Sequence, residues 1–452
     1  MIDDTIAAVS TPMGEGGIGI VRLSGFEAVA IADSLFRSPQ GIALADVASH
    51  TIHYGAIRMQ DQMIDEVLVS VMRAPRTYTR EDIVEINCHG GIVATRAVLD
   101  VVLKAGARMA ERGEFTKRAF VNGRISLDQA KAVLDIVHAR TALGLEAAVD
   151  RLGGRFTQAL ADLRSTLAKI LADLEVEIDY PDLAVNIEAV APRIEACSTR
   201  VREMLSRSES GRLIREGLTV AIIGRPNVGK STLLNALLSE ERAIVTPIPG
   251  TTRDTIEENA SLGGIPVRWI DTAGLRDADH PVEAEGVRRA RGAIDRADLL
   301  LLLVDTSEPR SAEDDHVLDL KAEVPSLLVL NKSDLPTVWD IIPTGSWSAS
   351  LSVSARDGSG VEQLRQEILK TLVDGKLPTR NSVLLLDTWE RDLLRRVGEQ
   401  LARACEVTRE DGQPDMVAEE LRLAYQTASE LQGIDISESI LDAVFSRFCV
   451  GK

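Results

Sequence analysis

The chain has 452 residues, which is enough for two or three domains with cores of their own. Its formal net charge of −18 at pH 7 argues against generic electrostatic binding of nucleic acid, so any contact with RNA must be local. Aromatic residues make up only 3% of the chain, a composition that favours helices packed through aliphatic side chains.

The cysteines are scattered without the spacing of a metal site, at Cys88, Cys197, Cys405 and Cys449. This usage predicts a reducing, cytoplasmic location. The longest aliphatic run, residues 299–304, is far too short to cross a bilayer and is expected to form a central strand. Met1 to Asp4 lack the basic start of a signal peptide. We therefore expect a cytoplasmic protein with no membrane partner.

Residues 1–120 alternate short strand-like runs with helical ones. The runs at 18–23 and 82–86 have the pattern of strands, and 92–104 has that of a helix. A glycine-rich segment at 14–19 precedes its strand instead of following it, so it does not fit a dinucleotide-binding loop, and we interpret it as a tight turn. The pattern predicts a compact α+β domain.

A locally basic stretch stands out in this acidic chain. Its members are Arg108, Arg112, Lys117, Arg118 and Arg124. Two interpretations stay open at this point: the cations lie on solvated helix faces, or they contact an anion or RNA.

Helical periodicity begins at a capping-box pattern, Ser126-Leu127-Asp128-Gln129, and continues to about residue 215. It returns after a breaker-rich Gly-Lys-Leu-Pro segment and runs on toward residue 452. We predict a helical domain in two halves, 121–215 and 376–452, with a separate domain, 216–375, inserted between them.

The inserted segment carries a complete phosphate-binding loop, G-x-x-x-x-G-K-[ST], at residues 224–231. An apolar strand-like run precedes the loop and a helical run follows it, so backbone N–H groups would surround the phosphates at a helix N-terminus. Lys230 would reach the β- and γ-phosphates, and the Ser231 hydroxyl would bind Mg²⁺.

Further motifs of a GTPase follow in the expected order. Thr252 is expected to bind Mg²⁺ when its segment orders around the γ-phosphate. Asp271, at the end of another strand-like run, would hold the Mg²⁺ shell, while the Gly274 backbone N–H would meet the γ-phosphate. The predicted magnesium ligands are therefore Ser231, Thr252 and Asp271.

A base-recognition motif, Asn-Lys-Ser-Asp, occupies residues 331–334. Asp334 can accept two hydrogen bonds from the N1–H and amino group of guanine, a pair of donors that adenine does not offer. The complete set expected to contact GTP is Asn227, Val228, Gly229, Lys230, Ser231, Thr232, Thr246, Pro247, Ile248, Pro249, Gly250, Thr251, Thr252, Asp271, Thr272, Ala273, Gly274, Asn331, Lys332, Ser333, Asp334, Ser354, Ala355 and Arg356. The predicted fold class is thus a multidomain α/β and α protein: an N-terminal α+β domain, a helical bundle and an inserted Ras-like P-loop GTPase domain.

One position departs from the Ras-type pattern. The residue after Asp271-Thr272-Ala273-Gly274, where Ras-type proteins place a glutamine that orients water, is Leu275. Because an apolar side chain cannot orient water, another group must do so.

Several motifs outside the GTPase core resemble the MnmE (TrmE) family of tRNA modification GTPases. They are Gly16 to Arg22, Glu81 to Glu85, His89 to Gly91, Gly113 to Arg124, and the Cys-x-Gly-Lys of residues 449–452. The resemblance spans the whole chain, and these motifs are more specific than the phosphate loop, which many unrelated proteins share.

The resemblance implies an enzyme that works with the flavoprotein MnmG in a heterotetramer. Together they would add an aminomethyl or carboxymethylaminomethyl group to carbon five of the wobble uridine of certain tRNAs. The one-carbon unit would come from a tetrahydrofolate derivative, methylene- or formyl-tetrahydrofolate. The N-terminal domain, 1–120, would form a homodimer and bind the folate.

Carried over by motif, the folate contacts are Arg22, Glu85, Arg124 and Lys452. The cations suit the folate glutamate carboxylates, and Glu85 can accept hydrogen bonds from pterin N–H groups. Arg124 stands where some family members have lysine, so the charge is retained.

The resemblance also implies how Leu275 is compensated. Family members hydrolyse GTP when two GTPase domains face each other, with K⁺ in the role of an arginine finger. By motif, Asn227 and Thr246 with the backbone of Ile248 and Thr251 would hold K⁺. Glu283 would orient the attacking water and so act in catalysis, with Lys230 and Thr252.

Cys449 has two interpretations. Its thiol would be a catalytic nucleophile toward carbon six of uridine, activated by nearby cations, or it would pack and position substrate. No histidine partner is visible in the local sequence.

Two other function classes have sequence features that this chain lacks or does not need. A ribosome-assembly GTPase of the Era kind carries its GTPase domain first and a KH module after it, and one of the Der kind has two phosphate loops. This chain has one such loop, placed late, and no KH pattern. A nucleotide-regulated scaffold would have no need of the folate set.

Overall fold

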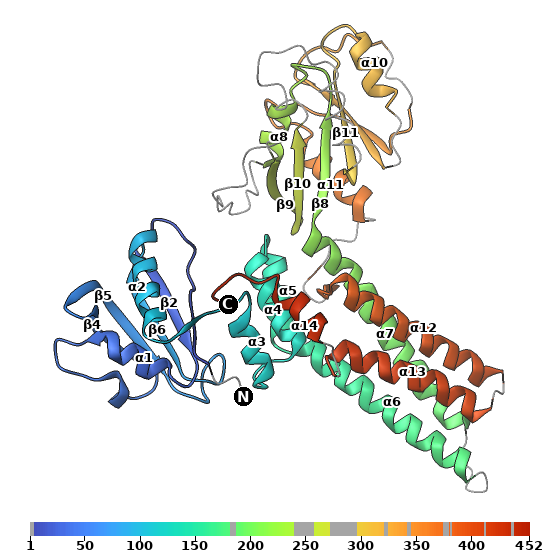
Figure 1. Cartoon of the computed structure of the whole chain (residues 1–452). Coiled ribbons are helices and arrows are strands. Elements are labelled where there is room, and N and C mark those ends of the chain that lie inside the picture. The colour runs from blue at the N-terminus through green and yellow to red at the C-terminus, as the bar shows by residue number, and fades with distance from the viewer. Residues whose placement is uncertain are drawn as a thin grey trace. The chain divides into compact units, whose positions relative to one another are not determined.

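In the computed structural model, the described residues are 4–180, 187–238, 257–271, 296–320, 324–340, 345–373, 379, 382–410, 413–434 and 438–452. They belong to two compact units. Figure 1 labels the helices and strands of both. The first combines Met1–Leu134, Leu152–Val185 and Pro414–Lys452, and the second combines Asp135–Arg151 and Asn186–Gln413. None of the helices in the described ranges is long and apolar enough to cross a membrane.

The first unit contains a seven-stranded sheet in the order β3-β4-β5-β6-β2-β1-β7. Its strands are β1 (Ile6–Val9), β2 (Ile18–Ser24), β3 (Phe36–Arg37), β4 (Thr51–Met59), β5 (Gln62–Met72), β6 (Ile83–His89) and β7 (Arg108–Met109). Only the β1–β7 pair is parallel among these described strands. This confirms the predicted α+β character of the N-terminal region.

Two helices, α1 (Ala28–Leu35) and α2 (Ile92–Lys104), cover one face of this sheet and bury its inward side chains. Side chains alternate along a strand, so Val21 and Leu23 of β2 enter the core while Arg22 lies on the opposite face. In the register, Arg22 stands beside Glu85 of β6. We call this second face, which α1 and α2 do not cover, the open face; it carries the Arg22–Glu85 pair, and Phe115 packs against part of it.

Five helices of the chain contribute to the rest of the first unit: α3 (Glu114–Val121), α4 (Leu127–His138), α6 (Arg155–Asp179), α13 (Pro414–Gln432) and α14 (Glu438–Phe445). The long α6 and α13 pack side by side, and Arg164 of α6 lies 5.2 Å from the Tyr425 ring centroid. Phe445 and Phe448 pack against Leu127 and Ala130 of α4. The chain then returns to the sheet, where Gly451 has a φ of +95° and an added Cβ would lie 2.2 Å from the Val9 carbonyl oxygen.

The second unit contains a six-stranded sheet in the order β13-β12-β11-β8-β10-β9. Its strands are β8 (Leu218–Ile223), β9 (Glu257–Leu262), β10 (Ile265–Asp271), β11 (Leu299–Asp305), β12 (Ser326–Asn331) and β13 (Ala349–Ser352). All neighbours are parallel except β9 and β10. All seven residues of β11 are buried, which confirms that the aliphatic run 299–304 is a central strand.

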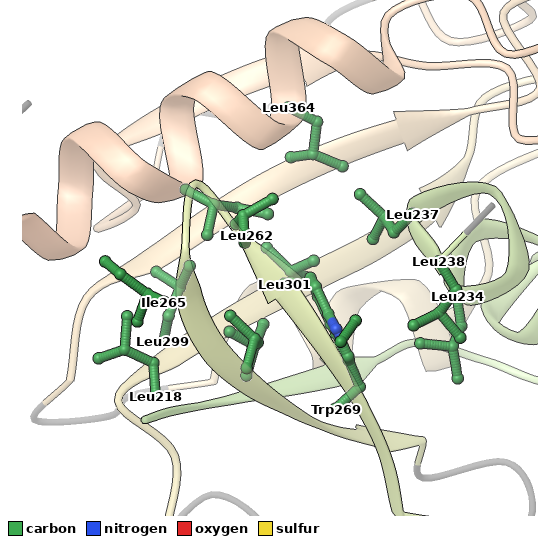
Figure 2. Packing of buried hydrophobic residues seen from close by; sticks show 14 of the residues in the cluster. Leu218, Leu234, Leu237, Leu238, Leu262, Ile265, Trp269, Leu299, Leu301 and Leu364 are labelled. Carbon is green, nitrogen blue, oxygen red and sulfur yellow. The ribbon is translucent and has the colours of Figure 1, made fainter. Parts of the chain in front are cut away.

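Helices cover both faces of this sheet. On one face α8 (Lys230–Leu238) and α11 (Val361–Val373) pack their leucines against the strands. Figure 2 shows Leu237 of α8, Leu364 of α11 and Trp269 of β10 in this cluster. On the other face lies α10 (Ala312–Leu318). This is the predicted P-loop GTPase fold.

A buried ion cluster joins the points where the chain enters and leaves this GTPase domain. Arg151 of α5 (Ala142–Leu152) is 3.0 Å from Asp135 and 2.6 Å from Glu390, which lies at the start of α12 (Thr388–Arg409). Arg215, at the end of α7 (Ile187–Glu216), is 3.3 Å from Asp135. Each of these four charges has an opposite charge within 3.3 Å. The exact domain boundaries stay a prediction.

Candidate functional site

The phosphate loop has the backbone that its glycines and asparagine permit. It connects β8 to α8, and both Asn227 and Gly229 adopt left-handed backbone, with φ of 62° and 100°. An added Cβ on Gly224 would lie 2.5 Å from the Leu303 carbonyl oxygen, and one on Gly229 would lie 2.4 Å from the Asn331 amide nitrogen. These close approaches require glycine.

Lys230 is nearly buried and held within its own loop. Its ammonium donates to the carbonyl oxygens of Gly224 and Arg225, both at 2.7 Å. The lysine thus lies at the start of α8 with its charge directed back over the loop, where phosphate oxygens would compete for it. Ser231 follows in the first turn of α8.

The base-recognition motif is tied to the phosphate loop through Asn331. Its side-chain amide donates to the Val228 carbonyl at 2.7 Å, and its oxygen accepts from the Ala355 backbone N–H at 3.1 Å. The Ser354 hydroxyl donates to the Asp334 carboxylate at 2.7 Å, which orients that carboxylate. The structure therefore brings together three of the segments predicted to contact GTP: the phosphate loop, residues 331–334 and residues 354–356.

The remaining nucleotide predictions cannot be compared with the structure. Asp271 ends β10, whose backbone pairs with β8 beside the phosphate loop. The other predicted residues lie outside the described ranges: Thr246, Pro247, Ile248, Pro249, Gly250, Thr251, Thr252, Thr272, Ala273, Gly274 and Glu283. Their roles stay predictions.

A second candidate site lies on the open face of the N-terminal sheet. A cavity of ≈ 250 Å³ is lined by Arg22, Met72, Tyr78, Ile83, Glu85, Val133 and Lys452. The sequence pointed to three of these, Arg22, Glu85 and Lys452. Sequence reasoning missed Met72, Tyr78, Ile83 and Val133, because no spacing pattern relates an aromatic residue in a loop to apolar residues on distant strands and helices.

Opposite charges face each other in this cavity. The Arg22 guanidinium is 2.7 Å from the Glu85 carboxylate, and it also donates to the Gly451 carbonyl at 3.3 Å. Burial and the nearby Arg22 charge lower the pKa of the Lys452 amine. Arg124 does not line the cavity, but its guanidinium stacks over the Tyr78 ring at 4.9 Å.

Cys449 is exposed and lies close to this cavity without lining it. Its backbone carbonyl accepts from the N–H groups of Gly113 and Lys452, both at 3.4 Å. Its thiol is near enough to influence the pKa of the Lys452 amine. Both roles, a nucleophile and a residue that positions substrate, stay predictions for Cys449.

The basic stretch is largely neutralised within the chain. Arg118 is 1% exposed and pairs with Asp4, Glu81 and Glu114, and Arg108 pairs with the first and last of these carboxylates. Lys117 is 2.8 Å from Asp442. Three of the five cations, Arg108, Lys117 and Arg118, are thus paired with carboxylates, whereas Arg112 and Arg124 are exposed.

Comparisons with known proteins cover the whole length of the chain. A family model described as GTP-binding protein TrmE N-terminus matches residues 5–124, and one described as MnmE helical domain matches residues 127–449. The tRNA modification GTPase MnmE of Geobacillus thermodenitrificans is 45% identical over 460 residues, covering 99% of each chain. That of Bacillus subtilis is 42% identical, covering 99% of this chain and 100% of the relative.

Among solved structures, the FeoB G-domain from Methanococcus jannaschii is 21% identical to this chain. It matches with a TM-score of 0.23, covering 34% of this chain and 97% of that one.

Proposed function

This chain belongs to the MnmE family of tRNA modification GTPases, and we propose that it acts with the flavoprotein MnmG on carbon five of the wobble uridine of certain tRNAs. The product would carry an aminomethyl or carboxymethylaminomethyl group. The observation that carries the proposal is the charged cavity on the N-terminal sheet, because a GTPase switch alone would not need it.

The cavity suits a tetrahydrofolate derivative as the one-carbon donor. Glu85 is held as an acceptor by Arg22, so it can take hydrogen bonds from pterin N–H groups. Arg22, Lys452 and the neighbouring Arg124 can meet the glutamate carboxylates of the folate. A bound folate would supply the carbon, and the residues of this chain would orient it and shield it from water.

Exchange of Glu85 for glutamine should weaken binding of 5-formyl-tetrahydrofolate by about 10- to 100-fold, because a charge-assisted hydrogen bond contributes roughly 1.5–3 kcal/mol. Calorimetric titration of the purified protein measures this. Glu27→Gln is the matched control, since Glu27 is exposed and lies away from the cavity. If folate binding is weakened equally in Glu85→Gln and Glu27→Gln, Glu85 is not part of the folate site.

GTP hydrolysis would open and close the GTPase domains and so gate this chemistry. Ser231, Thr252 and Asp271 would hold Mg²⁺, which would neutralise phosphate charge. Asn227 and Thr246, with the backbone of Ile248 and Thr251, would hold K⁺. The left-handed Asn227 in the phosphate loop supports this role, because it places an amide side chain at the loop that surrounds the phosphates.

Glu283→Ala should abolish hydrolysis while leaving GTP affinity within about two-fold, because a water-orienting carboxylate acts only in the transition state. Phosphate release and binding of a fluorescent GTP analogue, both measured in K⁺ buffer, separate the two effects. Equal loss of binding and hydrolysis would assign Glu283 a structural role instead.

We also propose that the chain forms a homodimer through its N-terminal sheet and works in the cytoplasm. Ile52, Tyr54 and Leu68 lie on the open face and are 66%, 55% and 45% exposed, an apolar surface suited to a second copy. Four free cysteines suit a reducing compartment.

Mass spectrometry of nucleosides from total tRNA tests the proposed product directly. The modified wobble uridine should disappear in a strain lacking this chain and return when the gene is restored. Unchanged nucleosides with accumulated ribosomal precursors would instead support a ribosome-assembly GTPase.

A further inference from the structure

Asp305 is a buried carboxylate beside the nucleotide site that none of the GTPase motifs includes. It ends the central strand β11 and is 1% exposed. One carboxylate oxygen accepts from the Ser307 backbone N–H at 2.9 Å and from the Ser307 hydroxyl at 2.6 Å. Its other oxygen lies 2.6 Å from the Lys332 ammonium.

Lys332 is a strained member of the base-recognition motif. Its φ is 62°, in the left-handed region that residues other than glycine rarely adopt, and it stands two residues before Asp334. Such a conformation persists only where the surroundings hold it. Asn331 is held on the amino-terminal side by its bonds to Val228 and Ala355, and the ion pair with Asp305 holds the Lys332 side chain itself.

Asp305 stays ionised in this place. Burial alone would raise the pKa of the carboxyl, but the Lys332 ammonium and the Ser307 donors outweigh it and hold the pKa below its ordinary value. A permanent charge inside the fold can therefore anchor the lysine. The phosphate-loop cation nearby, Arg225, has its own carboxylates in Glu308 at 2.6 Å and Asp314 at 3.2 Å, and is 3.9 Å from Asp305.

We propose that Asp305 is a positioning residue for guanine recognition: by holding Lys332 in its left-handed conformation, it places the Asp334 carboxylate against the base. The inference rests on the nucleotide site proposed above and extends it to a residue outside the motifs. Asp334 is then oriented from two directions, by Ser354 through a direct hydrogen bond and by Asp305 through the backbone of the turn.

The test compares GDP with IDP, whose base lacks the amino group of guanine and so forms one hydrogen bond fewer with Asp334. Affinities of the full chain for both are measured by competition with a fluorescent GDP analogue. Asp305→Asn should weaken GDP binding about 10-fold and narrow the preference for GDP over IDP. Lys332→Met should reduce the preference for GDP over IDP in the same way. This second variant tests the inference even if the Asp305 variant folds poorly. Glu308→Gln, which removes an exposed partner of Arg225, is the matched control and should leave the preference unchanged.

A second comparison tests whether Asp305 acts through the backbone conformation of residue 332. Glycine adopts a left-handed φ without strain, so in a Lys332→Gly background Asp305→Asn should change neither affinity nor preference. If Asp305→Asn acts equally in both backgrounds, or weakens GDP and IDP to the same extent, the inference is wrong. Failure of the unaltered chain to bind GDP would instead overturn the proposed nucleotide site.

Discussion

Asp334→Asn should weaken binding of GDP and GTP by about 10²- to 10⁴-fold and create affinity for xanthosine nucleotides. The carboxylate would accept two hydrogen bonds from guanine, each contributing roughly 1.5–3 kcal/mol because the acceptor is charged. Asparagine offers one acceptor and one donor side. Xanthine has a carbonyl where guanine has its amino group, so it presents the matching acceptor.

Competition binding with guanosine and xanthosine diphosphates measures the change in base selectivity. Asp319→Asn removes the same charge at an exposed position after α10, so it serves as the matched control with no expected effect on either nucleotide. Loss of guanosine diphosphate binding in Asp334→Asn with no gain of xanthosine diphosphate binding would show that Asp334 supports the fold of the loop and does not recognise the base.

Arg118→Met should destabilise the N-terminal sheet region by about 3–5 kcal/mol, the typical effect of removing one partner from a buried ion pair. Arg118 is 2.7 Å from Asp4, 3.0 Å from Glu114 and 3.2 Å from Glu81. Removal of the guanidinium leaves these carboxylates with Arg108 alone, and Arg108 pairs with only two of them.

The destabilisation caused by Arg118→Met should depend on pH, in a direction that the pKa of Glu114 sets. Burial alone would raise the pKa of Glu114, but hydrogen bonds from Arg108, the Glu111 N–H and Arg118 outweigh it and lower the pKa below 4.5. The stability that this carboxylate contributes is complete above its ordinary pKa and is lost as pH falls through the lowered value. The difference between Arg118→Met and the unaltered chain should therefore be largest near neutral pH and shrink as pH falls below 4.5.

Hydrogen exchange of peptides from α3 and β1 measures this effect. All four tryptophans, Trp269, Trp339, Trp347 and Trp389, belong to the second compact unit, so their fluorescence reports that unit alone and should not change. Arg112→Met is the matched control, because Arg112 is exposed and makes no ion pair with the described residues. A loss of protection in the control equal to that in Arg118→Met would mean that charge removal in general, and not the buried cluster, is responsible.

Local patterns in the sequence predicted what depends on neighbouring residues. The phosphate loop, the Asn-Lys-Ser-Asp turn and the central strand β11 each consist of consecutive residues. The signals for strand, turn and helix therefore lie within or next to the segment that they predict. The resemblance to a family supplied Arg22, Glu85 and Lys452, which no spacing rule would have joined.

What could not be predicted depends on contacts between distant residues. The sequence left Arg118 open between a solvated helix face and a contact with an anion or RNA, because its partners Asp4 and Glu81 are far away in the sequence. Asp305 showed only as the polar end of an apolar run, and its partner Lys332 directly follows β12, the strand that pairs with β11. Composition does not reveal which charges are neutralised by ion pairs between residues that are distant in the sequence.

The participation of Gly451 and Lys452 in the N-terminal cavity has a consequence for synthesis of the protein. Arg22 and Gly451 are 429 residues apart, yet they share a hydrogen bond. The strands that carry Arg22 and Glu85 leave the ribosome early, and at about 5–20 residues per second Gly451 and Lys452 follow roughly 20 to 70 s later. A ligand that contacts both Arg22 and Lys452 can therefore stabilise the cavity only in chains that have been translated as far as Lys452.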